Sequence, residues 1–156
     1  MIVYNSEFFT HSSKVFESRE MSMLTEQELN QLTHSIIEIA IEVHRELGPG
    51  LLEKVYQTCL RIALEDAGYQ VQSEISMPVF FRGQLIETEG YRIDLLVDNT
   101  IVIEIKSVLE LNSTHLKQLI TYLKLSDKPC GLLLNFNTAK LTDGIKRAKN
   151  GYLTSP

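Results

Sequence analysis

Two apolar segments joined by a short polar turn restrict the folds that are open to this chain. The segments, Ile93–Val97 and Ile101–Val108, are rich in isoleucine, valine and leucine, as buried strands are. Asp98, Asn99 and Thr100 lie between them and are residue types typical of turns. The pattern therefore predicts a β-hairpin.

Three charged side chains fall inside this apolar hairpin. Asp94 lies in the first segment, while Glu104 and Lys106 lie two residues apart in the second, where a strand places them on one face. Folding of the hairpin brings Asp94 to the same end of the sheet. Two carboxylates and an ammonium group in an apolar setting are costly to desolvate unless they pair or bind a metal. The hairpin therefore predicts a functional site.

Composition and charge indicate one globular domain. The chain has 156 residues, and its hydrophobic fraction of 44% is ordinary for a single domain. We expect residues 1–22 to be a mobile leader, with Met21 or Met23 as an alternative start, residues 23–150 to form the domain, and residues 151–156 to be a tail. The net charge of −5 disfavours broad charge-driven binding to nucleic acid, but it is compatible with a local basic groove around an acidic metal site.

The sequence carries no signal for a membrane or for secretion. No segment reaches the length of uncharged sequence that a transmembrane helix needs, and the N-terminus lacks the regions of a secretory signal. Cys59 and Cys130 lie in apolar segments without metal-ligand spacing, which is typical of reduced core cysteines. We therefore expect a cytoplasmic protein without membrane association.

Helical and strand periodicities extend the hairpin into a larger α/β domain. Helices are predicted over Thr25–Leu47, which starts with a capping box, and over Leu51–Ala67. An antiparallel meander of three strands should follow: Val71–Phe81, Leu85–Val97 and Ile101–Val108.

A crossover completes the predicted fold. A helix from Asn112 to about Leu125 precedes a short apolar strand, Cys130–Phe136, and this β–α–β order makes the strands on either side of the helix parallel. We therefore expect an α/β fold whose mixed sheet, an antiparallel meander plus a parallel strand, is flanked by helices. The basic segment Lys140–Lys149 is predicted to be a solvated surface rather than a binding patch.

The charged residues of the hairpin define a candidate metal site. Asp94 and Glu104 supply the hard oxygen ligands that Mg²⁺ or Mn²⁺ prefers, and Lys106 can orient or deprotonate an attacking water. Glu53, at the start of the second helix, is a further ligand or the holder of a second metal ion. The structural alternatives are a surface Glu–Lys pair beside a solvated aspartate, and a glutamate that only stabilises the helix start.

Several separated motifs resemble known families. The order of elements is similar to that of the PD-(D/E)XK nuclease superfamily, with its restriction-endonuclease-like core, and residues 50–56 fit the motif that names the GxxExxY family. The resemblance covers roughly residues 24–147. Four further segments also resemble family signatures: Val43–Gly50, Tyr91–Val97, Glu104–Val108 and Leu133–Phe136.

This resemblance implies roles for individual residues. Asp94 and Glu104 match the superfamily's metal-binding acids, and Lys106 matches its catalytic lysine. Glu53 matches the acidic residue of the first core helix. The proline that names the superfamily motif is absent, because Ile93 precedes Asp94, but many members share that departure.

The predicted activity is magnesium- or manganese-dependent hydrolysis of DNA or RNA. Gln118 and Tyr122, one helical turn apart, resemble an element of the superfamily's exonuclease-like members that orients the site or contacts nucleic acid, and the resemblance implies a catalytic role for both. One alternative is a catalytically silent module on the same fold that binds nucleic acid or protein. The other is an assembly subunit, such as a homodimer formed through helix Thr25–Leu47.

Overall fold

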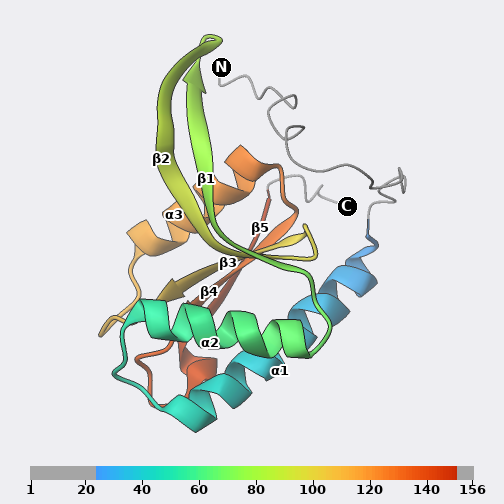
Figure 1. Cartoon of the computed structure of the whole chain (residues 1–156), viewed down its shortest axis with the longest axis vertical. Coiled ribbons are helices and arrows are strands. Elements are labelled where there is room, and N and C mark those ends of the chain that lie inside the picture. Colours follow the sequence, from blue (N-terminus) through green and yellow to red (C-terminus); the bar gives the residue numbers. More distant parts are fainter. Residues whose placement is uncertain (1–23, 151–156) are drawn as a thin grey trace.

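The computed structural model describes residues 24–150, so the predicted leader and tail lie outside the described residues. Three α-helices, five strands and a 3₁₀-helix follow one another in this range (Figure 1). In chain order they are α1 (Glu26–Leu47), α2 (Glu53–Asp66), β1 (Val71–Phe81), β2 (Gln84–Val97), β3 (Ile101–Lys106), α3 (Ser113–Ser126), β4 (Cys130–Asn135), η2 (Leu141–Gly144) and β5 (Ile145–Lys149).

The strands form one mixed sheet in the order β1-β2-β3-β4-β5. The meander of β1, β2 and β3 is antiparallel, whereas β3 and β4 pair in parallel across the α3 crossover. Both features confirm the predicted architecture. Local signals also place the helices, because Thr25 and Glu28 form the expected capping box and Asn112 caps α3.

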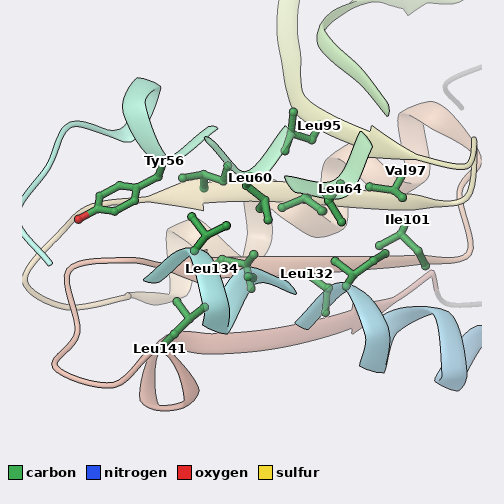
Figure 2. Close-up of a cluster of buried hydrophobic side chains, with 14 of the residues drawn as sticks. Tyr56, Leu60, Leu64, Leu95, Val97, Ile101, Leu132, Leu134 and Leu141 are labelled. Carbon is green, nitrogen blue, oxygen red and sulfur yellow. The ribbon is translucent and has the colours of Figure 1, made fainter. Parts of the chain in front are cut away.

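The two faces of the sheet carry separate hydrophobic clusters. Strand residues such as Ile103 and Leu132 pack with α1 and α2 on one face (Figure 2). Their neighbours Val102 and Leu133 pack with α3 on the other face. This alternation follows from the two-residue period of a strand, and it puts Glu104 on the same face as Val102.

Gly131 sets how closely α3 approaches the sheet. A Cβ atom at this position would lie 2.7 Å from Leu119 Cδ1 and 3.1 Å from the carbonyl oxygen of Val102. The missing side chain therefore allows α3 to pack directly on β4.

The C-terminal segment contains a strand that the sequence patterns do not predict. The basic stretch, expected to be a solvated surface rather than a binding patch, includes β5, which pairs antiparallel with β4 and buries Ala148. Lys146 and Arg147 are exposed, as expected, but Lys149 forms an ion pair with Glu26 of α1. The strand was missed because its few apolar residues are too sparse to show a strand period.

Strands β1 and β2 continue beyond the sheet as a two-stranded arm (Figure 1). Their register shifts between Met77 and Val79, next to Pro78, where an edge position or a bulge was expected. Gly90 lies in the stretch of β2 opposite this shift, between Glu87 and Tyr91. A Cβ atom at Gly90 would lie 2.9 Å from Glu87 Cγ, so the local backbone leaves little room for a side chain. The arm carries three exposed apolar side chains: Phe81, Leu85 and Ile86.

Candidate functional site

A cleft of about 680 Å³ is lined by residues from α2, α3 and the first three strands. The structure brings six residues singled out from the sequence into its wall: Glu53, Asp94, Glu104, Lys106, Gln118 and Tyr122. The remaining lining residues are Lys54, Gln57, Glu74, Ser76, Glu89, Gly90, Tyr91, Arg92 and Ile105.

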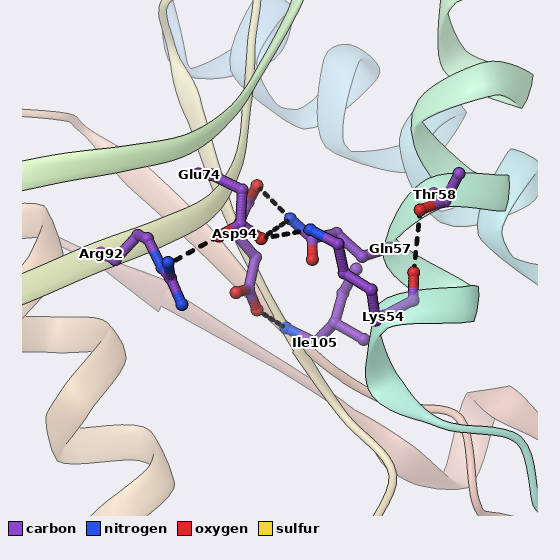
Figure 3. Close-up of polar contacts among 7 residues, drawn as sticks. All are labelled: Lys54, Gln57, Thr58, Glu74, Arg92, Asp94 and Ile105. Carbon is purple, nitrogen blue, oxygen red and sulfur yellow. Dashed lines mark hydrogen bonds and ion pairs between the residues drawn. The ribbon is translucent and has the colours of Figure 1, made fainter.

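Strands β2 and β3 fix the acidic centre of the cleft. Asp94 Oδ2 accepts a hydrogen bond of 2.8 Å from the backbone N–H of Ile105, which joins the two strands through a side chain (Figure 3). Lys106 Nζ donates to Glu104 Oε1 at 2.7 Å. Glu104 is only 3% exposed, and its Oε2 is a buried oxygen without a hydrogen-bond partner among the described residues.

The two carboxyl groups hold their protons more tightly than exposed carboxyl groups do. Burial, with the nearby charge of Asp94 adding to it, raises the pKa of Glu104 to about 7, although the Lys106 ammonium opposes this shift. Burial likewise raises the pKa of Asp94, against the Ile105 hydrogen bond and the charge of Lys106. Each carboxyl group is therefore poised to bind a cation, which would offset the cost of burying its charge.

The start of α2 is pinned by Tyr56, and this presents Glu53 to the cleft. The Tyr56 hydroxyl donates to the carbonyl oxygen of Gly48 at 2.6 Å and accepts from the N–H of Leu51 at 3.0 Å. Its buried ring stacks on Phe136 at a centroid distance of 4.5 Å. The spacing of glycine, glutamate and tyrosine in residues 50–56 thus has a local physical reason: the tyrosine closes the turn from which the glutamate emerges.

Asn135 anchors the chain that follows Lys106. Its Oδ1 accepts from the N–H of Val108 at 3.0 Å, and its Nδ2 donates to the carbonyl oxygen of Val108 at 2.9 Å. The N–H of Phe136 donates to the carbonyl oxygen of Lys106 at 2.8 Å. The end of β4 therefore holds the position of the lysine.

Helix α3 adds a polar pair on the other wall. Gln118 Nε2 donates to the Tyr122 hydroxyl oxygen at 2.8 Å, as their spacing of one helical turn suggests. Burial, together with the charge of Glu104, raises the pKa of Tyr122 to about 12, so the hydroxyl is protonated at neutral pH. Because its oxygen already accepts from Gln118, the Tyr122 proton is available to an acceptor.

A second polar cluster was missed from the sequence. Glu74 lies at its centre and binds Lys54 Nζ at 2.8 Å and Arg92 Nε at 2.9 Å (Figure 3). Gln57 Nε2 donates to Glu74 Oε1 at 2.7 Å and to the carbonyl oxygen of Asp94 at 3.0 Å. One signal was present, since Gln57 follows Glu53 by one helical turn and so faces the same way.

The residues present fit a hard divalent cation. The partnerless Glu104 Oε2 and the raised pKa values of Glu104 and Asp94 describe oxygen ligands in need of a positive charge. Within residues 24–150, however, no three His, Cys, Asp or Glu side chains are gathered into a ready-made cage. Asp94 and Glu104 are thus the two acids that would hold the ion, and the exposed Glu53 lines the same cleft.

Comparison with known families agrees with this geometry. The family described as the PD-(D/E)XK nuclease superfamily matches residues 30–148. The chain belongs to the PD-(D/E)XK nuclease superfamily. Nucleases of this superfamily typically use divalent metals, so membership supports a nuclease-like domain with a metal-dependent site.

The other comparisons add no relative from which a substrate could be inferred. Neither the curated proteins nor the solved structures contain a match to this superfamily member. Among the described helices, none has both the length and the apolar character needed to cross a membrane.

Proposed function

We propose that this protein is a magnesium- or manganese-dependent nuclease that hydrolyses phosphodiester bonds of DNA or RNA in the cytoplasm. The observation that carries the proposal is the buried pair of Glu104 and Lys106, in which one oxygen of Glu104 has no partner among residues 24–150. Asp94 and Glu104 would hold the metal ion, with Glu53 as a further ligand. A bound Mg²⁺ or Mn²⁺ supplies an activated water and positive charge for the phosphoryl oxygens.

Lys106 orients the attacking water in this proposal. Its ammonium group is mostly buried and fixed by Glu104, so it would donate a hydrogen bond to the attacking water from a position that is already set. Gln118 orients the Tyr122 hydroxyl, whose free proton is a donor for a phosphate oxygen. Together these side chains bind and orient, while the metal supplies the strongest positive charge.

We further infer that the chain is a GxxExxY protein within the superfamily. The contacts of Tyr56 with Gly48 and Leu51 support this assignment, because they give the motif spacing a purpose in presenting Glu53.

Cleavage assays with single- and double-stranded DNA and RNA test the proposal. Wild type should cut at least one substrate with Mg²⁺ or Mn²⁺ and lose the activity with a chelator. Lys106→Met should abolish cleavage, whereas Lys124→Met, on the exposed surface of α3, should leave it unchanged. If Lys106→Met cut as fast as wild type, the proposed site would be wrong.

The second candidate is a catalytically silent binding module, and two observations favour it. The cleft is lined by five acids but only three cations, which disfavours cleavage of a polyanion inside it and favours a protein partner, or nucleic acid bound outside the cleft. The arm also exposes Phe81, Leu85 and Ile86, as surfaces that bind protein partners or a second copy of the chain do. Binding to nucleic acid that is independent of metal, without cleavage, would favour this candidate.

A further inference from the structure

We propose that Arg92 and Lys54 form a phosphate-binding subsite beside the metal centre, held in place by Glu74. Its ligand would be a backbone phosphate of the nucleic-acid strand, next to the phosphate that is cut. This inference rests on the proposed function and adds a second contact to the same substrate.

Arg92 has the geometry of a phosphate clamp. Glu74 Oε2 binds its Nε, and the rest of the guanidinium group points away from Glu74 in Figure 3. The side chain is 64% exposed and lines the cleft. A guanidinium that is fixed through Nε keeps a planar fork of donors, which suits the oxygens of a phosphate.

Lys54 supplies a second cation from α2. It comes from the first turn of α2, next to Glu53, and its ammonium group binds the other oxygen of Glu74 at 2.8 Å. Although it is ion-paired, its side chain is 67% exposed. One carboxylate therefore holds two cations, one from α2 and one from β2, at the edge of the same cleft.

The cluster is fixed next to the acidic centre. Gln57 is buried and bridges Glu74 and the backbone of Asp94 with 2.7 Å and 3.0 Å hydrogen bonds. Glu74 also lies across from Asp94 in the sheet, because the flanking residues pair as Ser73 with Leu95 and Ile75 with Ile93. The Gln57 side chain therefore ties the carboxylate that holds both cations to the backbone of a proposed metal ligand.

The backbone of Glu74 supports a functional purpose for this arrangement. Its φ of 56° puts it in the left-handed region although it lies inside a strand. Residues other than glycine rarely adopt this backbone conformation. Such strain persists where the surrounding contacts enforce it, and it is frequent at functional sites. The Glu74 side chain accepts a hydrogen bond from Gln57 and forms both ion pairs, so the residue with this backbone conformation is also the one that orients both cations.

The distribution of charge in the cleft favours a phosphate as the ligand of the subsite. The lining contains five acids, so an anion entering the cleft meets repulsion except near Lys54, Arg92 and the bound metal. Lys106 is committed to Glu104 and mostly buried, which makes Lys54 and Arg92 the exposed cations of the described cleft lining. A phosphodiester backbone offers such anions at regular intervals, one for the metal and one for the subsite.

Binding of a fluorescein-labelled DNA oligonucleotide, and of its RNA counterpart, tests the subsite. Affinity is measured by anisotropy over a series of salt concentrations with Mg²⁺, in full-length Lys106→Met protein so that cleavage does not interfere. Arg92→Gln and Lys54→Met are added singly to this background. The matched controls are Arg45→Gln and Lys124→Met, which remove exposed cations outside the cleft lining.

We expect Arg92→Gln and Lys54→Met each to weaken binding by about tenfold. Each should also reduce the slope of log affinity against log salt by about 0.7 for a single strand, the share of one phosphate contact. Arg92→Lys, which keeps the charge but loses the fork, should retain the slope and lose part of the affinity. The two controls should leave both quantities unchanged.

Unchanged affinity and slope in both cleft variants, with folded protein by circular dichroism, would overturn the subsite. Failure of the proposed function has a different signature: Lys106→Met would then make no difference to cleavage, or no cleavage would occur, while Arg92→Gln still weakened binding. Equal weakening by the Arg45→Gln control would also overturn the subsite, because it would reveal a general effect of charge.

Discussion

Replacing Glu104 by glutamine should make the metal-free protein more stable at alkaline pH. Glutamine keeps the shape of the side chain but removes the charge that burial opposes. The Glu104 carboxyl group has a pKa of about 7 in the folded protein, against an ordinary value of 4.5. Each pKa unit of difference between the folded and unfolded states corresponds to about 1.4 kcal/mol. The raised pKa of Glu104 therefore makes about 3 kcal/mol of the folding free energy dependent on pH.

The direction of this effect follows from proton binding. The folded state holds the Glu104 proton more tightly than the unfolded state, so its contribution to stability is fully present below about pH 4.5, the unfolded pKa. It is lost as the pH rises through about 7. Wild type should therefore lose about 3 kcal/mol relative to Glu104→Gln between pH 4.5 and pH 8.

Urea unfolding with a chelator, repeated across this pH range, measures the difference. The pKa of about 7 already includes the attraction of Lys106 for the ionised carboxylate, so the dependence of the stability difference on pH is the quantity to read. Glu42→Gln, at an exposed position of α1, is the control and should track wild type. A difference between wild type and Glu104→Gln that stayed constant from pH 4.5 to pH 8 would refute the reasoning.

Magnesium should reverse the order of stability. At pH 8 a saturating metal stabilises only the protein that binds it, so wild type should gain stability in proportion to the logarithm of the Mg²⁺ concentration. Glu104→Gln keeps only Asp94 and Glu53 as ligands, so it should gain less than wild type at the same Mg²⁺ concentration. If both proteins gained equally, the metal would bind elsewhere.

Three further changes test other parts of the structure. Asp94→Asn should weaken Mg²⁺ binding at least about tenfold by isothermal titration calorimetry, and equal affinities would exclude Asp94 as a ligand. Tyr56→Phe leaves the Gly48 and Leu51 backbone groups without their partner, so urea unfolding should show a loss of about 1–3 kcal/mol; an unchanged midpoint would contradict the pinning of α2. Gly131→Ala should lower the free energy of unfolding by a similar amount, about 1–3 kcal/mol in urea, because the added methyl group crowds Leu119. An unchanged free energy of unfolding would show that α3 shifts to make room without cost.

Most helices and strands could be predicted because their ends and faces are set by residues close together in the sequence. The apolar runs on either side of Asp98 and Asn99 gave the hairpin, and both residues take positive φ angles in the turn. The capping residues Thr25 and Asn112 gave helix starts that the structure confirms. Strand β5 was missed because its pairing depends on β4, a partner that only the folded chain supplies.

The candidate site divides in the same way. Spacing alone put Glu104 and Lys106 on one face of a strand, since that relation needs no knowledge of the rest of the fold. The cluster around Glu74 could not be predicted, because a left-handed φ in a strand and a contact with Arg92 across two strands are products of tertiary packing. The sequence likewise gives no sign that one oxygen of Glu104 is buried without a partner among the described residues, because burial depends on the folded surroundings.

The anchoring of the cleft by the end of β4 has a consequence for protein synthesis. The candidate site residues lie between Glu53 and Tyr122, but Phe136 supports the Tyr56 ring and Asn135 holds the backbone after Lys106. A growing chain emerges from the ribosome N-terminus first, so all the candidate site residues leave the exit tunnel before either anchor does. The cleft can therefore assemble only after the crossover is complete, and a nascent chain next to messenger and ribosomal RNA carries the acids and the lysine without the framework that aligns them.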